Sequence, residues 1–222
     1  VGIAAYAAVS TFITGNVRDG LALGDAAWHL AEKYGDAADQ AYTAFMLGAF
    51  ILHWGRSPAV SEEFLERSVR LSVEAGDLAF GTYGVTHLIA TRHVRGVPLA
   101  ELARDVAHYE AWTKTVRLPH FEEFLVLYRQ FVRSLQGLTA SLYGFDEGDF
   151  REGEYVAALS DARKRFDYLL CKMQVLYLHG RCGEALKLAE EADRSAGEFV
   201  GLIAAAGTGF YHALIALATV GE

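Results

Sequence analysis

The stretch that decides the fold of this chain reads LYLHGRCGEALKLAEEA and runs from Leu176 to Ala192. Gly180 follows a long apolar run, and glycine is favoured just past a helix end because it tolerates the left-handed backbone found there. Ala185 and Ala192 lie on one face of the segment that follows, where small side chains let two helices approach closely. The stretch therefore predicts a tightly packed helical hairpin.

Similar turn glycines recur along the chain at nearly equal intervals. Gly15, Gly55, Gly96 and Gly137 follow one another at almost the same spacing, and Gly180 comes after a slightly longer one. Each of them ends a long apolar run, as expected at the end of a helix. The spacing, roughly 40 residues, is a repeat length found among helical repeat proteins. It therefore predicts a repeat architecture.

A second pair of marks repeats in the same phase. Gly35-Asp36 and Gly76-Asp77 are separated by the same interval as Gly55 and Gly96. Asp is a favoured residue at the start of a helix, because its side chain accepts a hydrogen bond from a free backbone N–H. Each pair is therefore expected to end one helix and to cap the next.

Two kinds of helix alternate between these marks. The first kind, apolar on nearly all sides, is expected at residues 36–54, 78–95, 120–138 and 164–179. The second kind is amphipathic and is expected at residues 60–75, 98–117 and 183–195. A buried helix covered by a half-polar helix, repeated along the chain, is typical of a helical solenoid. A four-helix bundle would not give this recurrence.

These patterns predict an all-α fold, a right-handed α-α superhelix of about five helix hairpins. A final helix is expected at 198–220, and the whole is expected to form a single repeat domain over residues 1–222. Residues 139–161 interrupt the pattern and predict a loop followed by a short helix at 154–161. A loop of this length is either functional or merely tolerated, and both interpretations stay open.

Composition and charge exclude several classes of protein. Hydrophobic residues make up 52% and charged residues 22%, which is typical of a folded domain. The net charge is −8, so the basic surface needed for nucleic acid is missing. Cys171 and Cys182 are expected to be reduced thiols, since their positions on a hairpin do not favour a disulfide. No secretory signal is visible, and we expect a cytoplasmic protein.

Both ends of the chain are apolar. Residues 199–220 carry no charge and could span a bilayer, but the small, mildly polar residues in their first part favour a buried solenoid helix over a membrane span. Residues 1–17 are also uncharged, whereas natural repeat arrays end in polar capping repeats. We therefore expect a fragment of a longer protein that continues on both sides, which self-associates through its apolar ends when isolated.

The hairpin at 176–192 resembles a tetratricopeptide repeat. Gly180, Ala185 and Ala192 stand where that repeat has its turn glycine and its small packing residues. Met173 departs from the pattern, because a small residue is usual at its position. The chain is therefore similar to tetratricopeptide repeats without matching them strictly.

From about Tyr6 to Leu217 the chain also resembles the helical region that follows the AAA-type ATPase domain in large bacterial signalling proteins. The segments that carry this resemblance are His53-Trp54, EAGDLAF at 74–80, GVPLAEL at 96–102, and 169–180 followed by Glu184-Ala185. Those proteins join a serine/threonine kinase-like domain, the ATPase domain, this helical region, a GAF domain and often a histidine kinase. The resemblance implies a regulatory role between a nucleotide-driven switch and kinase output. The region is also similar to the sensor solenoids of ATP-dependent transcription activators, which bind small inducers or partner proteins.

The sequence contains no motif for catalysis or metal binding. None of the eight histidines stands in a His-Glu-x-x-His pattern, and neither a Cys-x-x-Cys pair nor a Gly-Lys-Ser/Thr phosphate loop occurs. Gly207-Thr208-Gly209 begins like a dinucleotide fingerprint, but the third glycine and the preceding strand are missing. We therefore expect no catalytic residue, no metal and no cofactor, and hence no enzyme.

Aromatic and polar residues on the inner helices give the candidate binding site. Most of the aromatic side chains are expected in the core, and a minority would line a concave groove. The residues assigned to the groove are His53, Tyr83, His87, Arg92, Tyr128, Arg129 and Lys172. Two functions stay open. The first is a regulatory scaffold that binds proteins or neighbouring domains of the same chain, and the second is a sensor that binds a small molecule.

Overall fold

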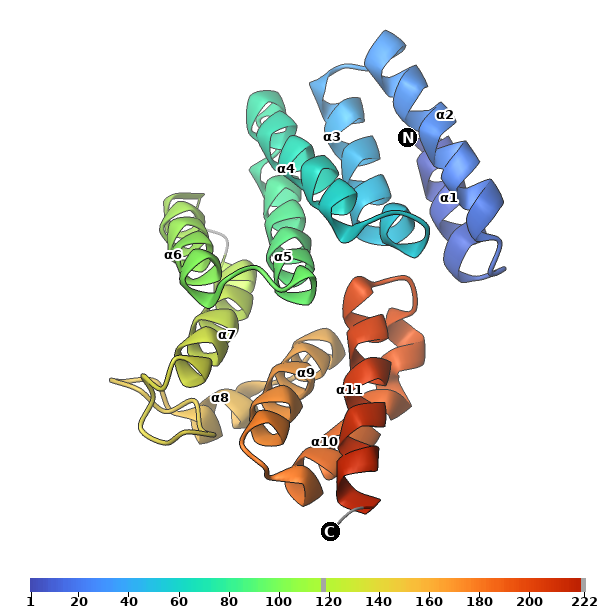
Figure 1. Cartoon of the computed structure of the whole chain (residues 1–222). Helices are drawn as coiled ribbons and strands as arrows, with labels where there is room; N and C mark the ends of the chain where they lie inside the picture. Colours follow the sequence, from blue (N-terminus) through green and yellow to red (C-terminus); the bar gives the residue numbers. More distant parts are fainter. Residues whose placement is uncertain (117–118, 221–222) are drawn as a thin grey trace. The chain divides into compact units, whose positions relative to one another are not determined.

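The computed structural model describes residues 1–116 and 119–220. Regular structure within these ranges is helical, apart from an isolated antiparallel bridge between Glu147 and Phe150. The predicted all-α class is therefore confirmed. The elements labelled in Figure 1 are α1 (Gly2–Phe12), α2 (Val17–Tyr34), α3 (Ala37–Met46), α4 (Pro58–Ala75), α5 (Leu78–Arg95), α6 (Leu99–Val116), α7 (Pro119–Leu135), α8 (Glu152–Ala158), α9 (Ala162–Leu178), α10 (Cys182–Ala196) and α11 (Ile203–Val220). A π-helical turn, η1 (Leu47–Ile51), and two 3₁₀ turns, η2 (Leu52–Trp54) and η3 (Gly197–Phe199), complete them.

Contacts divide the chain into two compact units. Of the described residues, unit 1 holds 1–97, 112–116, 119–121 and 200–203, and unit 2 holds 98–111, 122–199 and 204–220. The right-handed superhelix and the single repeat domain expected from the sequence depend on how successive helix pairs are stacked. Both stay predictions.

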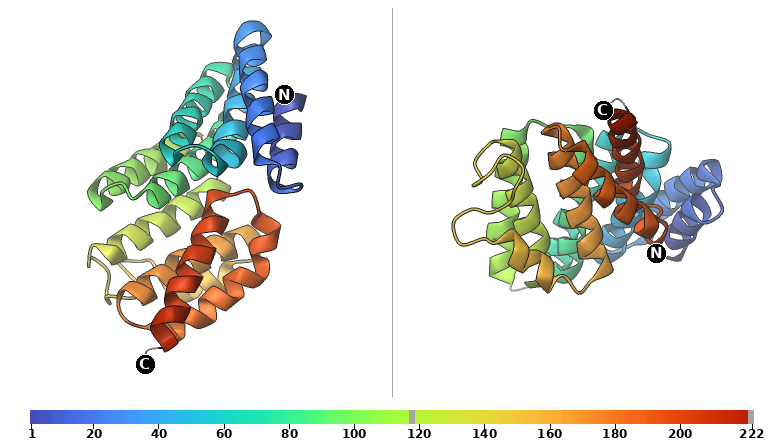
Figure 2. Two further views of the ribbon diagram at one scale, coloured as in Figure 1. Left: turned by 45° about the vertical axis from the view of Figure 1, so that its right-hand side comes forward. Right: turned by 90° about the horizontal axis from the view of Figure 1, so that it is seen from below.

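Unit 1 is built from paired helices. α1 packs against α2, α3 against α4, and α4 also against α5; α1 lies beside α2 in both views of Figure 2. Gly20 of α2 makes the first pair possible, because a Cβ there would lie 1.9 Å from Thr11 Oγ1 and 3.1 Å from the carbonyl oxygen of Ala7. Small side chains therefore set how closely these two helices approach.

The predicted helix caps form in unit 1. Asp36 Oδ1 accepts a hydrogen bond from the N–H of Asp39 at 2.9 Å, and Asp77 Oδ1 accepts one from the N–H of Phe80 at 3.0 Å. Gly15, Gly96, Gly137 and Gly180 have left-handed backbones, as predicted. Gly76, predicted to end a helix, is left-handed too, whereas its counterpart Gly35 is extended with φ at −85°. The positions of most helix ends were therefore predicted by their local chemistry.

Gly55 differs from the other turn glycines, with φ at −141°. The helix before it does not end as a regular α-helix, because α3 passes into the π-helical turn η1 and then into η2. A Cβ at residue 55 would lie 2.4 Å from Leu21 Cδ1, so the end of the Leu21 side chain would have to move to admit a larger residue. The prediction of a left-handed glycine at this position was wrong.

Unit 2 contains the hairpin on which the fold prediction began. α9 packs against α10, and Ala185, Ala189 and Ala192 of α10 are fully buried. The apolar side chains around them come from α9, with Phe166 and Met173 both fully buried. The small residues of α10 therefore allow close packing, as the sequence predicted.

The short helix after the loop lies earlier in the sequence than predicted. The short helix expected at 154–161 lies at Glu152–Ala158. Asp161 instead caps α9, where its Oδ1 accepts hydrogen bonds from the N–H groups of Arg163 at 2.8 Å and Lys164 at 3.1 Å. A strong N-cap residue thus separates two helices here.

The final helix begins later than expected. It starts at Ile203, because Gly197–Phe199 form a 3₁₀ turn and Gly201 has φ at +102°. Two features of the sequence prediction, the end of one helix at Arg117 and the side chain of His120, lie outside the described residues.

The burial of α11 is lower than the sequence predicted. Its buried residues are Ile203, Ala204, Thr208 and Ile215. Exposed apolar side chains lie along the rest, with Leu217 73% and Val220 88% exposed. Among the described residues, α11 is the one helix long and apolar enough to cross a membrane by length and composition.

Candidate binding surfaces

The residues predicted to line one groove fall in both units. Unit 1 holds His53, Tyr83, His87 and Arg92, and unit 2 holds Tyr128, Arg129 and Lys172. Each of these side chains contacts other residues of its own unit. What these contacts do differs from residue to residue.

Tyr83 and His87 belong to an aromatic cluster in unit 1. Phe45 lies at its centre, with ring centroids 5.3 Å from His87 and 6.4 Å from Tyr83. His87 is buried, whereas Tyr83 is 50% exposed and meets Phe121 edge-on at 4.9 Å. Edge-to-face pairs of this kind stabilise packing beyond the area they bury. Tyr83 is therefore the member of the pair that a ligand could reach.

His53 contacts the segment Val200–Ile203, which is distant in the sequence but belongs to the same unit. It lies in η2, and its Nε2 is 3.1 Å from the carbonyl oxygen of Gly201. Burial lowers the pKa of His53 to about 4, so the imidazole is neutral at pH 7. In the neutral ring the Nε2–H donates to the Gly201 carbonyl. A Cβ on Gly201 would lie 2.8 Å from Phe12 Cδ1, so glycine is required where the segment passes α1.

Arg92 and Arg129 each join two helices through ion pairs. Arg92 of α5 contacts Glu62 at 3.0 Å and Glu66 at 2.6 Å, both on α4, and its side chain is 14% exposed. Arg129 of α7 contacts Glu110 of α6 at 2.7 Å. Since their guanidinium groups already face carboxylates, a bound ligand would have to compete with these pairs.

Tyr128 lies in the core of unit 2. Its ring is 4.6 Å from Phe124 and 6.0 Å from Phe131, and its side chain is buried. Burial raises the pKa of its hydroxyl well above the usual value. Tyr128 is therefore a core packing residue and does not line a groove, although the sequence had predicted that it would.

Lys172 lines a cavity of about 500 Å³, which we call the Lys172 cavity. Its walls are the first residue of α8, side chains of α9 and α10, and four loop residues: Ser141, Tyr143, Gly144 and Asp146. Lys172 Nζ donates to the carbonyl oxygen of Tyr143 at 2.7 Å and lies 2.6 Å from Glu152 Oε1. Tyr168 Oη also donates to Glu152 Oε1, at 2.8 Å. Of the predicted residues, Lys172 is the one that lines a described cavity.

The Glu152 carboxylate holds the irregular loop against α9. Its Oε2 accepts a hydrogen bond from the N–H of Phe145 at 3.1 Å, and the Phe145 side chain is fully buried. Lys172 lies over the Phe145 ring at 4.8 Å. These contacts tie the loop to α8 and α9 beside the Lys172 cavity.

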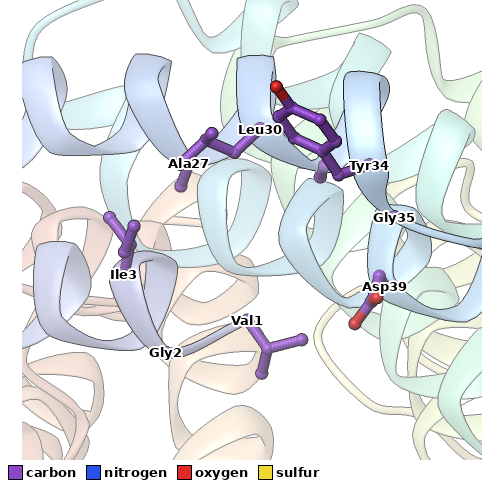
Figure 3. A pocket seen from close by; sticks show the side chains of 9 residues that line it. Val1, Gly2, Ile3, Ala27, Leu30, Tyr34, Gly35 and Asp39 are labelled. Atoms are coloured by element: carbon purple, nitrogen blue, oxygen red, sulfur yellow. The ribbon is translucent and has the colours of Figure 1, made fainter.

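A second surface was not predicted from the sequence. It is a cavity of about 340 Å³, which we call the N-terminal hollow. Figure 3 shows the side chains that line it. Leu30 and Tyr34 of α2 lie on one side, Val1 and Ile3 on the other, and Asp39 of α3 at one end. Tyr34 is 73% exposed. The helical spacing of Ala27, Leu30 and Tyr34 could have shown that α2 has apolar residues beyond those its packing needs.

Metal binding and thiol chemistry have no support in the described residues. No group of three His, Cys, Asp or Glu side chains in those ranges could hold a metal ion. Cys171 and Cys182 are buried and unbonded, and burial raises the pKa of the Cys171 thiol well above its usual value. A thiol of this kind is unreactive because little thiolate forms.

The described residues form paired helices of an all-α fold, with exposed apolar side chains and the Lys172 cavity. No protein-family model matches the chain, and neither a curated protein nor a solved structure matches it. The resemblance to the helical region of bacterial signalling proteins therefore stays a prediction.

Proposed function

We propose that this chain is a non-catalytic regulatory or scaffolding module that binds proteins or neighbouring domains of its own parent chain. The resemblance described above supports a setting in a cytoplasmic bacterial signal-transduction protein with kinase and ATPase domains. The observation that carries the proposal is the exposure of apolar side chains on regular helices, at the N-terminal hollow and along α11. Contiguous apolar surfaces of this kind are typical of interaction sites.

The exposed side of α11 has the form of a contact surface. Residues at helical spacing form one stripe, the α11 stripe: Ala206, Gly209, Phe210, Ala213, Leu217 and Val220. The opposite side packs in unit 2 through Ala204 and Ile215. A partner that covers the exposed apolar side of such a helix stabilises the complex by about 25 cal/mol per Å² of apolar area buried.

The polar residues of the inner helices favour the same conclusion. Arg92 and Arg129 hold carboxylates of neighbouring helices, and His53 holds a backbone carbonyl. These polar side chains therefore stabilise helix packing, and a partner would bind at the exposed apolar surfaces instead.

The test is binding of the full chain to the domains encoded beside it, followed by crosslinking. We expect crosslinks and protection from hydrogen exchange at the α11 stripe or the N-terminal hollow. Phe210→Asp with Leu217→Asp should abolish contacts made by α11, whereas Arg194→Asp on the exposed side of α10 should leave them unchanged. Absence of any contact with the neighbouring domains would overturn the proposal.

A second candidate function is a small-molecule sensor, and the Lys172 cavity favours it. The cavity combines the aromatic ring of Tyr168, the apolar side chain of Leu188 and the charges of Lys172 and Glu152. Pockets with a few polar groups on an apolar lining are typical of ligand sites. A thermal-shift screen of metabolites should then find a compound that stabilises the chain but not its Leu188→Asp variant. A screen that finds no such compound would reject this function.

A further inference from the structure

The Lys172 cavity has the size of a small-molecule site. Its volume of about 500 Å³ falls within the range of about 300–1,000 Å³ that is usual for ligand pockets. Its lining residues lie between Ser141 and Leu188, and all of them belong to unit 2. The loop, α8, α9 and α10 of this unit therefore supply the whole lining.

Most of the charges at the Lys172 cavity are already paired. Lys172 Nζ lies 2.6 Å from Glu152 Oε1 and 2.9 Å from Glu152 Oε2. Glu184 Oε1 accepts a hydrogen bond from Arg181 Nε at 2.7 Å, and the Arg181 guanidinium lies over the Tyr143 ring at 4.6 Å. Because these charges satisfy one another, they contribute little net attraction for a charged ligand.

Two charges of opposite sign remain at the cavity. Asp146 of the loop and Lys187 of α10 both line it. Within residues 1–116 and 119–220, neither of them has an ion pair. Asp146 Oδ1 accepts the N–H of Glu152 at 2.7 Å, which holds this carboxylate at the start of α8. The cavity therefore offers one anion and one cation that a ligand can pair with.

An apolar wall adjoins these charges. Leu176 of α9 is buried, and Leu188 of α10 is partly buried against the same core cluster of unit 2; we call these two side chains the leucine wall. Tyr168 adds an aromatic ring to the lining. An apolar group of a ligand would displace water from the leucine wall, which favours binding.

We infer that the Lys172 cavity binds an apolar zwitterion, with its ammonium group at Asp146, its carboxylate at Lys187 and its apolar body on the leucine wall. The inference rests on the second candidate function, the small-molecule sensor, and names the chemistry of the ligand. A ligand with only a negative charge would leave Asp146 as an unpaired like charge, and a ligand with only a positive charge would leave Lys187 so. Free amino acids with a large apolar side chain have the required chemistry, and so do dipeptides of such residues.

Calorimetric titration of the full chain with a matched set of compounds tests the inference. Leucine carries both charges, isoamylamine is the same molecule without the carboxylate, and isocaproate is the same molecule without the ammonium group. Glycine keeps both charges without the apolar side chain, and leucyl-leucine places the two charges farther apart. We expect the tighter-binding of leucine and leucyl-leucine to exceed isoamylamine, isocaproate and glycine about tenfold in affinity, since each of these three lacks one contact. The comparison of leucine with leucyl-leucine shows whether the ligand is an amino acid or a peptide.

Two variants test the two charges separately. Asp146→Asn removes the negative charge, but its side-chain oxygen can still accept the N–H of Glu152. Lys187→Gln removes the positive charge at an exposed position of α10, where Gln is a good helix former. Each variant should weaken binding of the zwitterion about tenfold. Asp146→Asn should not weaken isocaproate, and Lys187→Gln should not weaken isoamylamine. The matched controls Glu63→Gln and Lys33→Gln, at exposed positions of unit 1, should leave every affinity unchanged.

The inference is overturned if zwitterions and single-charge compounds bind equally, or if either Asp146→Asn or Lys187→Gln leaves the affinity for the zwitterion unchanged. Absence of binding at millimolar concentration also overturns it. If a compound of another class stabilises the wild type but not Leu188→Asp, the cavity takes a different ligand and the sensor function stands. If neither the zwitterions nor the metabolite screen gives a ligand, the inference and the sensor function both fail.

Discussion

Protonation of His53 should destabilise unit 1 in weak acid. The buried imidazole has a pKa of about 4, below its ordinary value of 6.5, so between these pH values the folded chain binds fewer protons than the unfolded chain. The stability that depends on a neutral His53 is therefore present above pH 6.5 and is lost as the pH falls toward 4. The whole difference corresponds to about 3 kcal/mol, of which about 2 kcal/mol is lost between pH 7 and pH 5.

Urea denaturation followed by circular dichroism at pH 7, 6 and 5 measures this loss. The informative comparison is with His53→Gln, because Gln can still donate to the Gly201 carbonyl but does not titrate. Other groups titrate equally in both proteins, so the difference between the two stability curves belongs to His53. The matched control is His29→Gln, which replaces a histidine on the exposed side of α2.

The expected result is a wild-type chain that loses about 2 kcal/mol more than His53→Gln over this range. Parallel stability curves for the wild type and His53→Gln would show that protonation of His53 does not destabilise the fold. That result would refute the burial of His53 against Gly201. A loss that is equally reduced by His29→Gln would also contradict the reasoning.

Three further predictions concern packing and burial. Gly48→Ala should cost about 1–3 kcal/mol in urea denaturation, because the new Cβ would lie 2.9 Å from a carbonyl oxygen of α4; Gly183→Ala, with open space around it, should cost nothing. Lys172→Met should lower the melting temperature, because it leaves the Glu152 carboxylate without its cation, and adding Glu152→Gln should restore most of the loss. Cys171 should react with a thiol reagent only after urea is added, since burial raises its pKa; rapid reaction in the native chain would contradict this.

Local signals predicted most of the helices. The cap at Asp77 and the left-handed glycine at Gly96 depend on a few neighbouring residues, so the sequence carries them directly. The π-helical turn η1 could not be predicted, because it depends on packing against α4, where Gly48 comes close to Leu65. The late start of α11 could not be predicted either, because the backbone at Gly201 is set by its contacts with His53 and Phe12.

The candidate site was harder to predict than the helices. Arg92 was expected to face a groove, but whether it does depends on the rotation of α5, which places the guanidinium beside Glu62, 30 residues earlier. The exposure of Tyr34 depends likewise on what packs against α2. Periodicity shows which residues share one side of a helix, and tertiary packing decides which of those sides is covered.

The contact of His53 with Gly201 has a consequence for protein synthesis. The two residues are 148 positions apart, although both belong to unit 1. On the ribosome, the helices up to α5 can pair as soon as they emerge, but Val200–Ile203 reaches them only after α6 to α10 have been translated as well. Unit 1 can thus begin to fold when its first helices emerge, and it cannot be completed until residue 203 has been made.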